Sequence, residues 1–392
     1  MKIAYILSAT NPHGGASKAF KTMLSGLMKL GVEPIIIVPD KEGLYKEFME
    51  QGLSVYALRY KLNIYPGHRT LKKVIEFIPR LITKYILNTI ASQQLATILQ
   101  KEHIDIVHTN VGVINIGYLA SRKAQIPHIY HIREYADLDF DMDVFPSKKH
   151  FRQQLNERQS YSICITRDIQ QHHHQTGKDS SRVIYDGIKP AIKKLVEHEK
   201  SPYLLYAGRI EPAKGLMDLL IAYAECIKET PEVLPLFIAG SIHQENYWND
   251  IQAFIQEVGL QKQIHYLGQV QDIEQYMQKA RAIIIPSRFE GFGLCMPEAM
   301  FNGCLAVGRN TGGTKEQLDN GRQLQGEEIA LRFENIQQLS HHLKEISLMP
   351  TEHYRPMVER AFQTVNHLYT EENNAQQIFQ FYQTILEIDK RL

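Results

Sequence analysis

The sequence predicts an α/β protein built from two parallel β-sheets flanked by helices. Short apolar runs alternate with longer helical patterns, which is typical of strand–helix–strand units with parallel strands. The alternation restarts after a polar, lysine-containing stretch at 189–200. A chain of 392 residues is also long for a single core. We therefore expect two Rossmann-like domains, 1–188 and 189–371, facing each other across a central cleft.

The expected elements follow in order along each half of the chain. In the first half, apolar runs typical of strands lie at 2–8, 34–39, 54–58, 104–110, 128–133 and 162–166. In the second half, they lie at 203–208, 235–240, 264–268, 282–286 and 305–308. Helical patterns lie at 16–30, 42–51, 215–230, 247–258, 271–280, 297–302 and 356–392. Ligands of such sheets bind at the carboxyl ends of strands, so functional residues are expected just after the apolar runs.

Composition excludes several classes of protein. The 44 Lys and Arg balance 43 Asp and Glu, so no overall positive charge indicates nucleic-acid binding. The 4 cysteines form no C-x-x-C pair and are interpreted as reduced thiols. The sequence shows neither a signal-peptide pattern nor an apolar run long enough for a transmembrane helix. A cytoplasmic protein is expected.

The loop after the first strand contains Gly14 and Gly15, directly before a helix. Glycines there let a ligand approach the backbone, and a helix N-terminus favours an anion. The pattern is not the G-x-G-x-x-G of dinucleotide-binding proteins. A plain strand-to-helix turn is the alternative.

The stretch AGRIEPAKG at 207–215 places Arg209 and Lys214 beyond a strand. Arginine grips phosphate oxygens with two donors, and lysine supplies a point charge. The pair could neutralise a diphosphate, or it could be solvated surface.

The stretch FEGFGLCMPEAMFNG at 289–303 carries two carboxylates, Glu290 and Glu298. Glu298 falls in the first turn of the expected helix, where the helix dipole alone would stabilise it. Glu290 lies among glycines, where a carboxylate gains nothing obvious for folding. Both could accept hydrogen bonds from sugar hydroxyls. A further glycine turn, TGGTKE at 311–316, could bind an anion or be a simple turn.

Taken together, the segments GRIEPAKG, IAG, IIIPSRFEGFGLCMPEAMFNG and NTGGTKE resemble retaining glycosyltransferases of family 4 (glycosyl transferases group 1) in order and spacing. The resemblance implies the GT-B fold, an N-terminal acceptor-binding domain and a C-terminal domain for a nucleoside-diphosphate sugar. It also implies that the last helix, about 372–392, returns to the first domain. Asp186-Gly187-Ile188 departs from the Asn-Gly-Ile common in the family.

The resemblance also implies site roles. Arg209 and Lys214 would bind the diphosphate and stabilise charge on the leaving group. Glu298 would hold the ribose, while Glu290 and the backbone amides of Phe292, Gly293 and Leu294 would contact the transferred sugar. Gly14 and Gly15 would leave room for phosphate and acceptor. His131 matches the family's active-site histidine, although a structural histidine is the alternative.

The implied reaction is a retaining transfer from a UDP or GDP type of sugar, without a cofactor or a required metal. The acceptor would be a glycan or a lipid-linked molecule, and the resemblance implies a role in bacterial surface polysaccharide synthesis. Two alternatives stay open: a UDP-sugar 2-epimerase, and a glycan-binding homologue without turnover.

Three further stretches admit two interpretations each. The segment 61–90 combines basic and apolar residues. It could contact the anionic inner face of the cell membrane, or it could form a core-facing amphipathic helix. DLDFDMD at 137–143 contains D-x-D, but we expect a solvated acidic loop rather than a metal site. QHHHQ at 171–175 is expected to be a polar helix surface.

Overall fold

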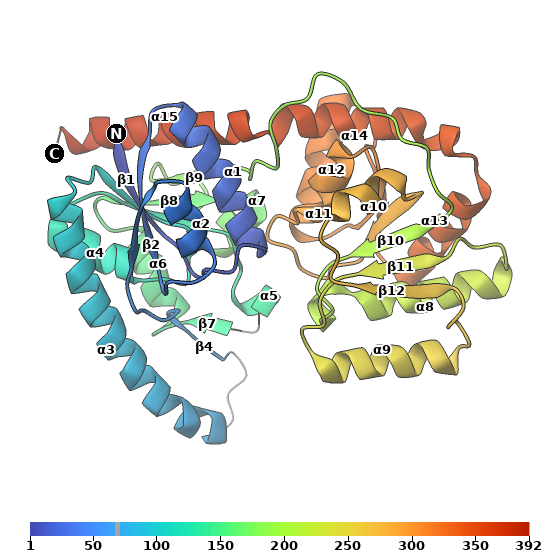
Figure 1. Ribbon diagram of the computed structural model, residues 1–392, viewed down its shortest axis with the longest axis horizontal. Coiled ribbons are helices and arrows are strands. Elements are labelled where there is room, and N and C mark those ends of the chain that lie inside the picture. Colours follow the sequence, from blue (N-terminus) through green and yellow to red (C-terminus); the bar gives the residue numbers. More distant parts are fainter. Residues whose placement is uncertain (67–70, 141, 392) are drawn as a thin grey trace. The chain divides into compact units, whose positions relative to one another are not determined.

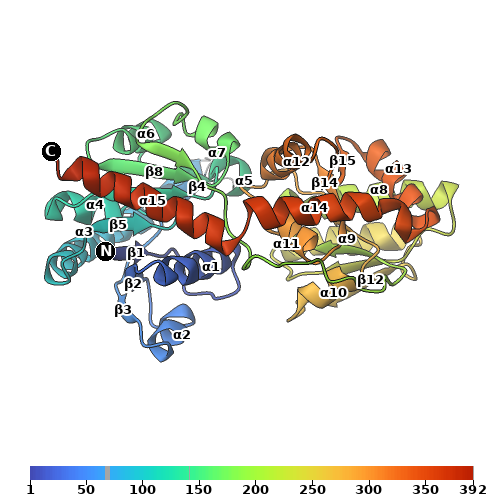
Figure 2. The same cartoon turned by 90° about the horizontal axis from the view of Figure 1, so that it is seen from above.

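The computed structural model describes residues 1–66, 71–140 and 142–391, without the side chains of 66 and 71–74. The chain divides into two compact units. The first comprises Met1–Pro190 together with Glu371–Leu392, and the second comprises Ala191–Thr370. Each unit contains one large parallel sheet with helices on both faces (Figures 1 and 2). The predicted α/β class is therefore confirmed.

The sheet of the first unit has 7 parallel strands in the order β3-β2-β1-β5-β6-β8-β9. Their bounds are β1 Lys2–Ile6, β2 Glu33–Val38, β3 Ser54–Ala57, β5 Ile106–Thr109, β6 His128–Ile132, β8 Ser160–Cys164 and β9 Ser181–Val183. A separate antiparallel pair joins β4 Ile64–Pro66 to β7 Met142–Val144. The helices are α1 Gly15–Lys29, α2 Leu44–Glu50, α3 Leu71–Lys101, α4 Ile116–Ala124, α5 Asp137–Phe140, α6 Lys148–Leu155, α7 Arg167–His172 and α15 Glu371–Asp389.

Helices cover the first sheet because its central strands are apolar on both faces. One face packs against α1 and α15, which contribute residues such as Phe20, Leu27 and Ile378 to the core. The other packs against α3 and α4 through residues such as Leu95 and Ile116. Thus a helix from the end of the chain completes the core of the first unit.

The sheet of the second unit has 6 parallel strands in the order β12-β11-β10-β13-β14-β15. Their bounds are β10 Leu204–Ala207, β11 Leu236–Ala239, β12 Ile264–Gly268, β13 Ala282–Ile285, β14 Leu305–Arg309 and β15 Leu331–Phe333. The helices are α8 Leu216–Glu229, α9 Glu245–Glu257, α10 Ile273–Lys279, α11 Cys295–Phe301, α12 Gly312–Gln325, α13 Ile336–Leu348 and α14 Arg355–Leu368, with 3-10 turns η1 Pro212–Lys214 and η2 Thr351–Tyr354.

The strand order of the second sheet reverses direction at one point, between β10 and β13. The chain proceeds outward from β10 to β11 and β12, then returns to the other side of β10 as β13. The loops after β10 and β13 therefore diverge from adjacent strands at the carboxyl edge. Open α/β sheets bind ligands at such a switch point.

Candidate functional site

The switch point of the second unit brings together Lys214 and Glu290, which lie far apart in the sequence. Lys214 is the last residue of η1, in the connection after β10, and Glu290 lies in the loop after β13. The Lys214 Nζ is 2.7 Å from Glu290 Oε1, and the side chains are 19% and 14% exposed. Because both side chains are partly buried, solvent and salt screen their attraction less than that of a pair on the surface. A cation and a carboxylate therefore meet at the position where this fold binds ligands.

The loop carrying Lys214 is shaped by Gly215. This residue has φ +69°, a left-handed conformation that favours glycine. A Cβ atom there would overlap the carbonyl oxygen of Pro286, at the end of β13. The Arg288 N–H also donates to the Ala213 carbonyl at 2.9 Å. The two switch-point loops therefore lie in direct backbone contact.

Arg209 lies two residues beyond β10, on the same side of the switch point. Its Nη2 is 2.9 Å from Oε1 of Glu211, and the arginine side chain is 40% exposed while the Glu211 side chain is 9% exposed. The buried Glu211 carboxylate therefore contacts one terminal nitrogen of the Arg209 guanidinium, and the arginine side chain stays partly accessible. Glu211 was missed by the sequence analysis, although it stands within the GRIEPAKG stretch.

The second switch-point loop carries Phe292, Gly293 and Leu294 into α11. Gly293 has φ +82°, and the buried Phe292 ring packs edge-on against Tyr369 with centroids 5.3 Å apart. Glu298 is half-buried and lies in the first turn of α11, where the helix dipole favours a carboxylate. The loop thus presents Glu290 at one end and Glu298 at the other.

The first turns of α12 pack against this loop and form hydrogen bonds with its backbone. The Gly313 N–H donates to the Glu290 carbonyl at 2.8 Å, and Gln317 Nε2 donates to the Phe292 carbonyl at 2.7 Å. A Cβ on Gly313 would come within 2.5 Å of the Phe292 carbonyl oxygen. Gly313 of the TGGTKE stretch therefore allows close packing of α12 against the loop.

Asp218 in the first turn of α8 connects this helix to the loop after β13 and to the end of β14. Its carboxylate pairs with Arg288 at 2.9 Å and with Arg309 at 2.5 Å. Arg309 Nε also donates to the Pro286 carbonyl at 2.9 Å. No single stretch of the sequence contains this cluster, so the sequence alone does not indicate it.

The predicted residues of the first unit lie at the carboxyl ends of β1 and β6. Gly14 is the N-cap of α1, with an extended backbone that any residue could adopt, and Gly15 is its exposed first residue. His131 lies within β6 and is fully buried. Its Nδ1 is 3.0 Å from His108 Nε2. Burial lowers the pKa of His131 well below its ordinary value.

Asp186 forms a buried ion pair with Arg133, which follows β6. Arg133 Nε also donates to the side-chain oxygen of Asn110 at 3.2 Å. The family's usual asparagine could accept a hydrogen bond here but not neutralise the guanidinium. Asp186, which stands where the family has asparagine, therefore supplies the negative charge that balances the buried Arg133.

The acidic stretch 137–143 and the histidine-rich stretch 171–175 form ion pairs and hydrogen bonds within the first unit. Asp137 pairs with Lys148, and with His172 at 2.8 Å. His173 Nε2 lies 3.0 Å from the Glu134 carbonyl oxygen. The D-x-D stretch is thus not simply solvated, because among its described residues Asp137 and Asp139 are both partly buried.

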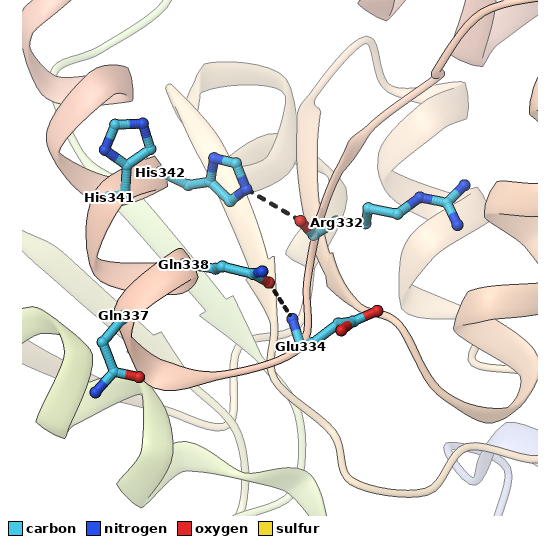
Figure 3. A pocket seen from close by; sticks show the side chains of 6 residues that line it. All are labelled: Arg332, Glu334, Gln337, Gln338, His341 and His342. Carbon is cyan, nitrogen blue, oxygen red and sulfur yellow. Dashed lines mark hydrogen bonds between the residues drawn. The ribbon is translucent and has the colours of Figure 1, made fainter.

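A pocket of about 640 Å³ in the second unit lies away from the predicted residues, where β15 ends and α13 begins (Figure 3). Its lining residues are Arg332, Glu334, Gln337, Gln338, His341 and His342. Several of its polar groups bond one another: His342 Nε2 lies 3.0 Å from the Arg332 carbonyl oxygen, and the Glu334 N–H donates to Gln338 at 2.8 Å. The switch point has the more convergent charges, so we place the candidate site there.

Comparison with known proteins identifies the family and the fold of the chain. Residues 13–191 match the family Glycosyltransferase Family 4, and residues 188–364 match Glycosyl transferases group 1. HepE of Anabaena, solved in complex with UDP, superposes with a TM-score of 0.75 at 18% identity, covering 98% of this chain and 100% of that one. This likeness establishes the GT-B fold.

Two curated relatives are glycosyltransferases by name. An uncharacterized glycosyltransferase of Methanocaldococcus jannaschii is 25% identical over 228 residues, 57% of this chain and 61% of the relative. The capsular polysaccharide biosynthesis glycosyltransferase CapH of Staphylococcus aureus is 22% identical over 231 residues, 54% of this chain and 61% of the relative. The chain thus aligns with about three fifths of the length of each. The chain belongs to the group 1 glycosyltransferases with the GT-B fold.

Proposed function

We propose that the protein transfers a sugar, with retention of anomeric configuration, from a nucleoside-diphosphate sugar to a glycan or lipid-linked acceptor. The observation that carries this proposal is the contact of Lys214 with Glu290 at the switch point of the second unit. A diphosphate needs a cation there, and a sugar needs a hydrogen-bond acceptor beside it. The contact supplies both groups in one place.

Each charged group has a role in this proposal. Lys214 and Arg209 bind the diphosphate and stabilise the negative charge that builds on it as the sugar departs. Glu298 binds the ribose hydroxyls. Glu290 and the backbone amides of Phe292, Gly293 and Leu294 bind the transferred sugar.

Roles are also proposed for three residues of the first unit. Gly14 and Gly15 lack side chains and leave room for phosphate and acceptor. His131 is assigned to the transferred sugar.

The chemical step requires neither a metal nor a second carboxylate at the anomeric carbon. The bond from the anomeric carbon to the phosphate oxygen breaks, and a bond to the acceptor oxygen forms on the same face. The acceptor's proton passes to the departing phosphate oxygen. Lys214 and Arg209 lower the barrier because they contact the oxygens on which charge develops.

UDP is the first donor nucleotide to test, because HepE has been solved with it; GDP is the second. The role of CapH in capsular polysaccharide biosynthesis supports a function in surface polysaccharide synthesis. We propose a cytoplasmic site of action, in which an acceptor on the inner face of the membrane would be accessible.

Donor hydrolysis or transfer tests the proposal. Lys214→Ala should reduce turnover at least about 100-fold, the usual cost of removing a group that stabilises transition-state charge. Glu290→Ala should also reduce turnover, because the transferred sugar loses the carboxylate that orients it. Lys228→Ala removes the same charge from an exposed position in the last turn of α8 and should leave turnover unchanged. Unchanged turnover in both site variants would overturn the assignment. Donor binding without turnover by the native chain would favour the non-catalytic homologue, and epimerised UDP-sugar would favour the 2-epimerase.

We also propose that α3 contacts the membrane surface. Among the described residues, no helix combines the length and apolar character needed to cross a membrane. The outer face of α3 nevertheless exposes large apolar side chains, each 47–71% accessible: Ile75, Ile78, Ile82, Tyr85, Ile86 and Ile90. At 100° per residue they form one stripe. Within this segment Arg69 lies outside the described residues, and the side chains of Lys72 and Lys73 are also not described.

Vesicle flotation tests the contact. The chain should float with vesicles containing anionic phosphatidylglycerol at low salt, and less at high salt. The double variant Ile78→Asp/Ile82→Asp should stay in solution. Leu348→Asp, at an exposed apolar position on α13, should float like the native chain. Absence of flotation of the native chain at low salt would refute the proposal.

A further inference from the structure

A chain of buried aromatic and imidazole groups runs from the C-terminal helix to His131. Tyr382 of α15 places its hydroxyl 2.5 Å from Nδ1 of His108, on β5. His108 Nε2 is in turn 3.0 Å from Nδ1 of His131, on β6. The hydroxyls of Tyr382 and Tyr5 are 3.3 Å apart. All four side chains are almost completely buried.

Arg133 determines the direction of the hydrogen bonds in this chain. A guanidinium can only donate, and Arg133 Nη2 lies 3.4 Å from His131 Nδ1. Asp186 and Asn110 fix the same guanidinium in place. If Nδ1 of His131 carried a proton, it would face the Arg133 N–H as a second donor, and no hydrogen bond could form between them. Nδ1 of His131 is therefore the acceptor of the contact with His108.

The remaining protons follow from this assignment. His108 donates from Nε2 to His131, so its own Nδ1 accepts from the Tyr382 hydroxyl. Both histidines are neutral, because burial and the neighbouring Arg133 lower the pKa of His108 to about 3 and that of His131 in the same direction. In neutral His131 the single ring proton must then lie on Nε2.

The Nε2 atom of His131 is buried and has no hydrogen-bond partner among the described residues. A buried donor without an acceptor is rare in folded proteins, because its desolvation is not compensated. Such an atom points to an acceptor that the protein itself does not supply.

We propose that Tyr382, His108 and Arg133 are positioning residues that hold His131 in the neutral Nε2–H form, as a donor to an oxygen of the bound sugar or phosphate. The ligand part of this inference rests on the proposed function. The proton assignment does not. In this form His131 cannot act as a general base, because Nδ1 is occupied and Nε2 already carries the proton.

Imidazole ¹⁵N NMR of the native chain tests the proton assignment without any substrate. The signals of His131, assigned by comparison with His131→Gln, should show protonated Nε2 and unprotonated Nδ1, unchanged from pH 6 to 8. The groups facing it, His108 and Arg133, should keep their protonation over this range. A proton on Nδ1, a tautomer mixture or a charged ring would overturn the inference.

Variants then test the role of the chain of contacts. Tyr382→Phe removes one hydroxyl and should shift the His131 signals toward a tautomer mixture, with kcat for donor turnover reduced about tenfold, the effect of one misplaced hydrogen bond. His131→Gln keeps a donor near the position of Nε2, so it should retain more activity than His131→Asn. Unchanged His131 signals in a folded Tyr382→Phe variant would remove Tyr382 from the proposal. If that variant does not fold, the native spectrum still decides the tautomer.

If native His131 shows the expected tautomer but no sugar nucleotide is turned over, the proposed function fails and the proton assignment stands. If turnover occurs with the opposite tautomer, the positioning inference fails and the proposed function stands.

Discussion

At the scale of single residues, the contact of Lys214 with Glu290 brings a cation and a carboxylate together at the switch point of the second unit. Lys214 and Glu290 were identified because each stands after an apolar run and among glycines or prolines. Their 2.7 Å contact depends on the pairing of β10 with β13, which no local stretch encodes. The same applies to Asp218 and to the pairing of Arg133 with Asp186. The roles proposed for the site residues stay predictions until they are measured.

Glu134 gives a residue-scale prediction about pH. Burial, followed by the nearby Asp139, raises the pKa of Glu134 from 4.5 to about 7. The folded chain therefore holds a proton that the unfolded chain releases above pH 4.5, so this group's contribution to stability is lost as pH rises from about 4.5 to 7. Glu134→Gln removes the titration. The unfolding free energy of the variant minus that of the native chain should rise by about 3 kcal/mol from pH 4.5 to pH 8, since one pKa unit corresponds to about 1.4 kcal/mol.

Urea unfolding of both proteins at several pH values measures this difference. Comparing the variant with the native chain cancels the titration of distant groups, while Asp139, whose own pKa is raised to about 6, contributes a smaller residual slope. Parallel stability curves for the two proteins would contradict the assignment.

At the scale of elements, apolar runs located the strands to within a few residues. The run predicted at 282–286 forms β13, Ala282–Ile285, and the helix predicted to begin near Pro297 begins at Cys295. The mixed segment 61–90 was ambiguous because periodicity shows that a helix has two faces but not which one is covered. The structure shows a stripe of exposed apolar side chains on α3, opposite to residues such as Leu95 that enter the core.

Gly215 gives a prediction about the switch-point loop. Gly215→Ala forces a side chain into a left-handed residue and against the Pro286 carbonyl. Gly326→Ala is the matched control, because Gly326 also has positive φ but no atom lies within 4 Å of its Cβ position. The control should cost about 1 kcal/mol and preserve turnover. Gly215→Ala should cost clearly more and abolish donor turnover.

Thermal unfolding and a donor hydrolysis assay on both variants make this comparison. Equal losses of stability, with turnover intact in both, would show that the contact of this loop with Pro286 is unimportant.

At the scale of the whole molecule, the strand alternation predicted two α/β units but not the order of strands in their sheets. The order follows from long-range pairing, such as β10 with β13, which the sequence does not display. The structure also assigns Glu371–Leu392 to the first unit. Five residues of α15 enter that core: Ala375, Ile378, Phe381, Tyr382 and Ile385.

This division predicts different behaviour for separate fragments. Residues 191–370 contain a complete core and should unfold cooperatively on their own. Residues 1–190 lack α15 and should be unstable, since each large buried side chain contributes roughly 1.5–3 kcal/mol. Adding a peptide of residues 371–392 should restore a cooperative transition, followed by circular dichroism. A stable fragment 1–190 would show that α15 is dispensable for this core.

We propose above that the second unit binds a nucleoside diphosphate at Lys214. A thermal-shift titration with UDP and GDP tests it most directly, because a ligand of the native state raises the melting temperature. At least one nucleotide should raise the melting temperature of the native chain and of Lys228→Ala, and should raise that of Lys214→Ala little or not at all. An equal rise in Lys214→Ala, or no rise with either nucleotide in the native chain, would contradict it.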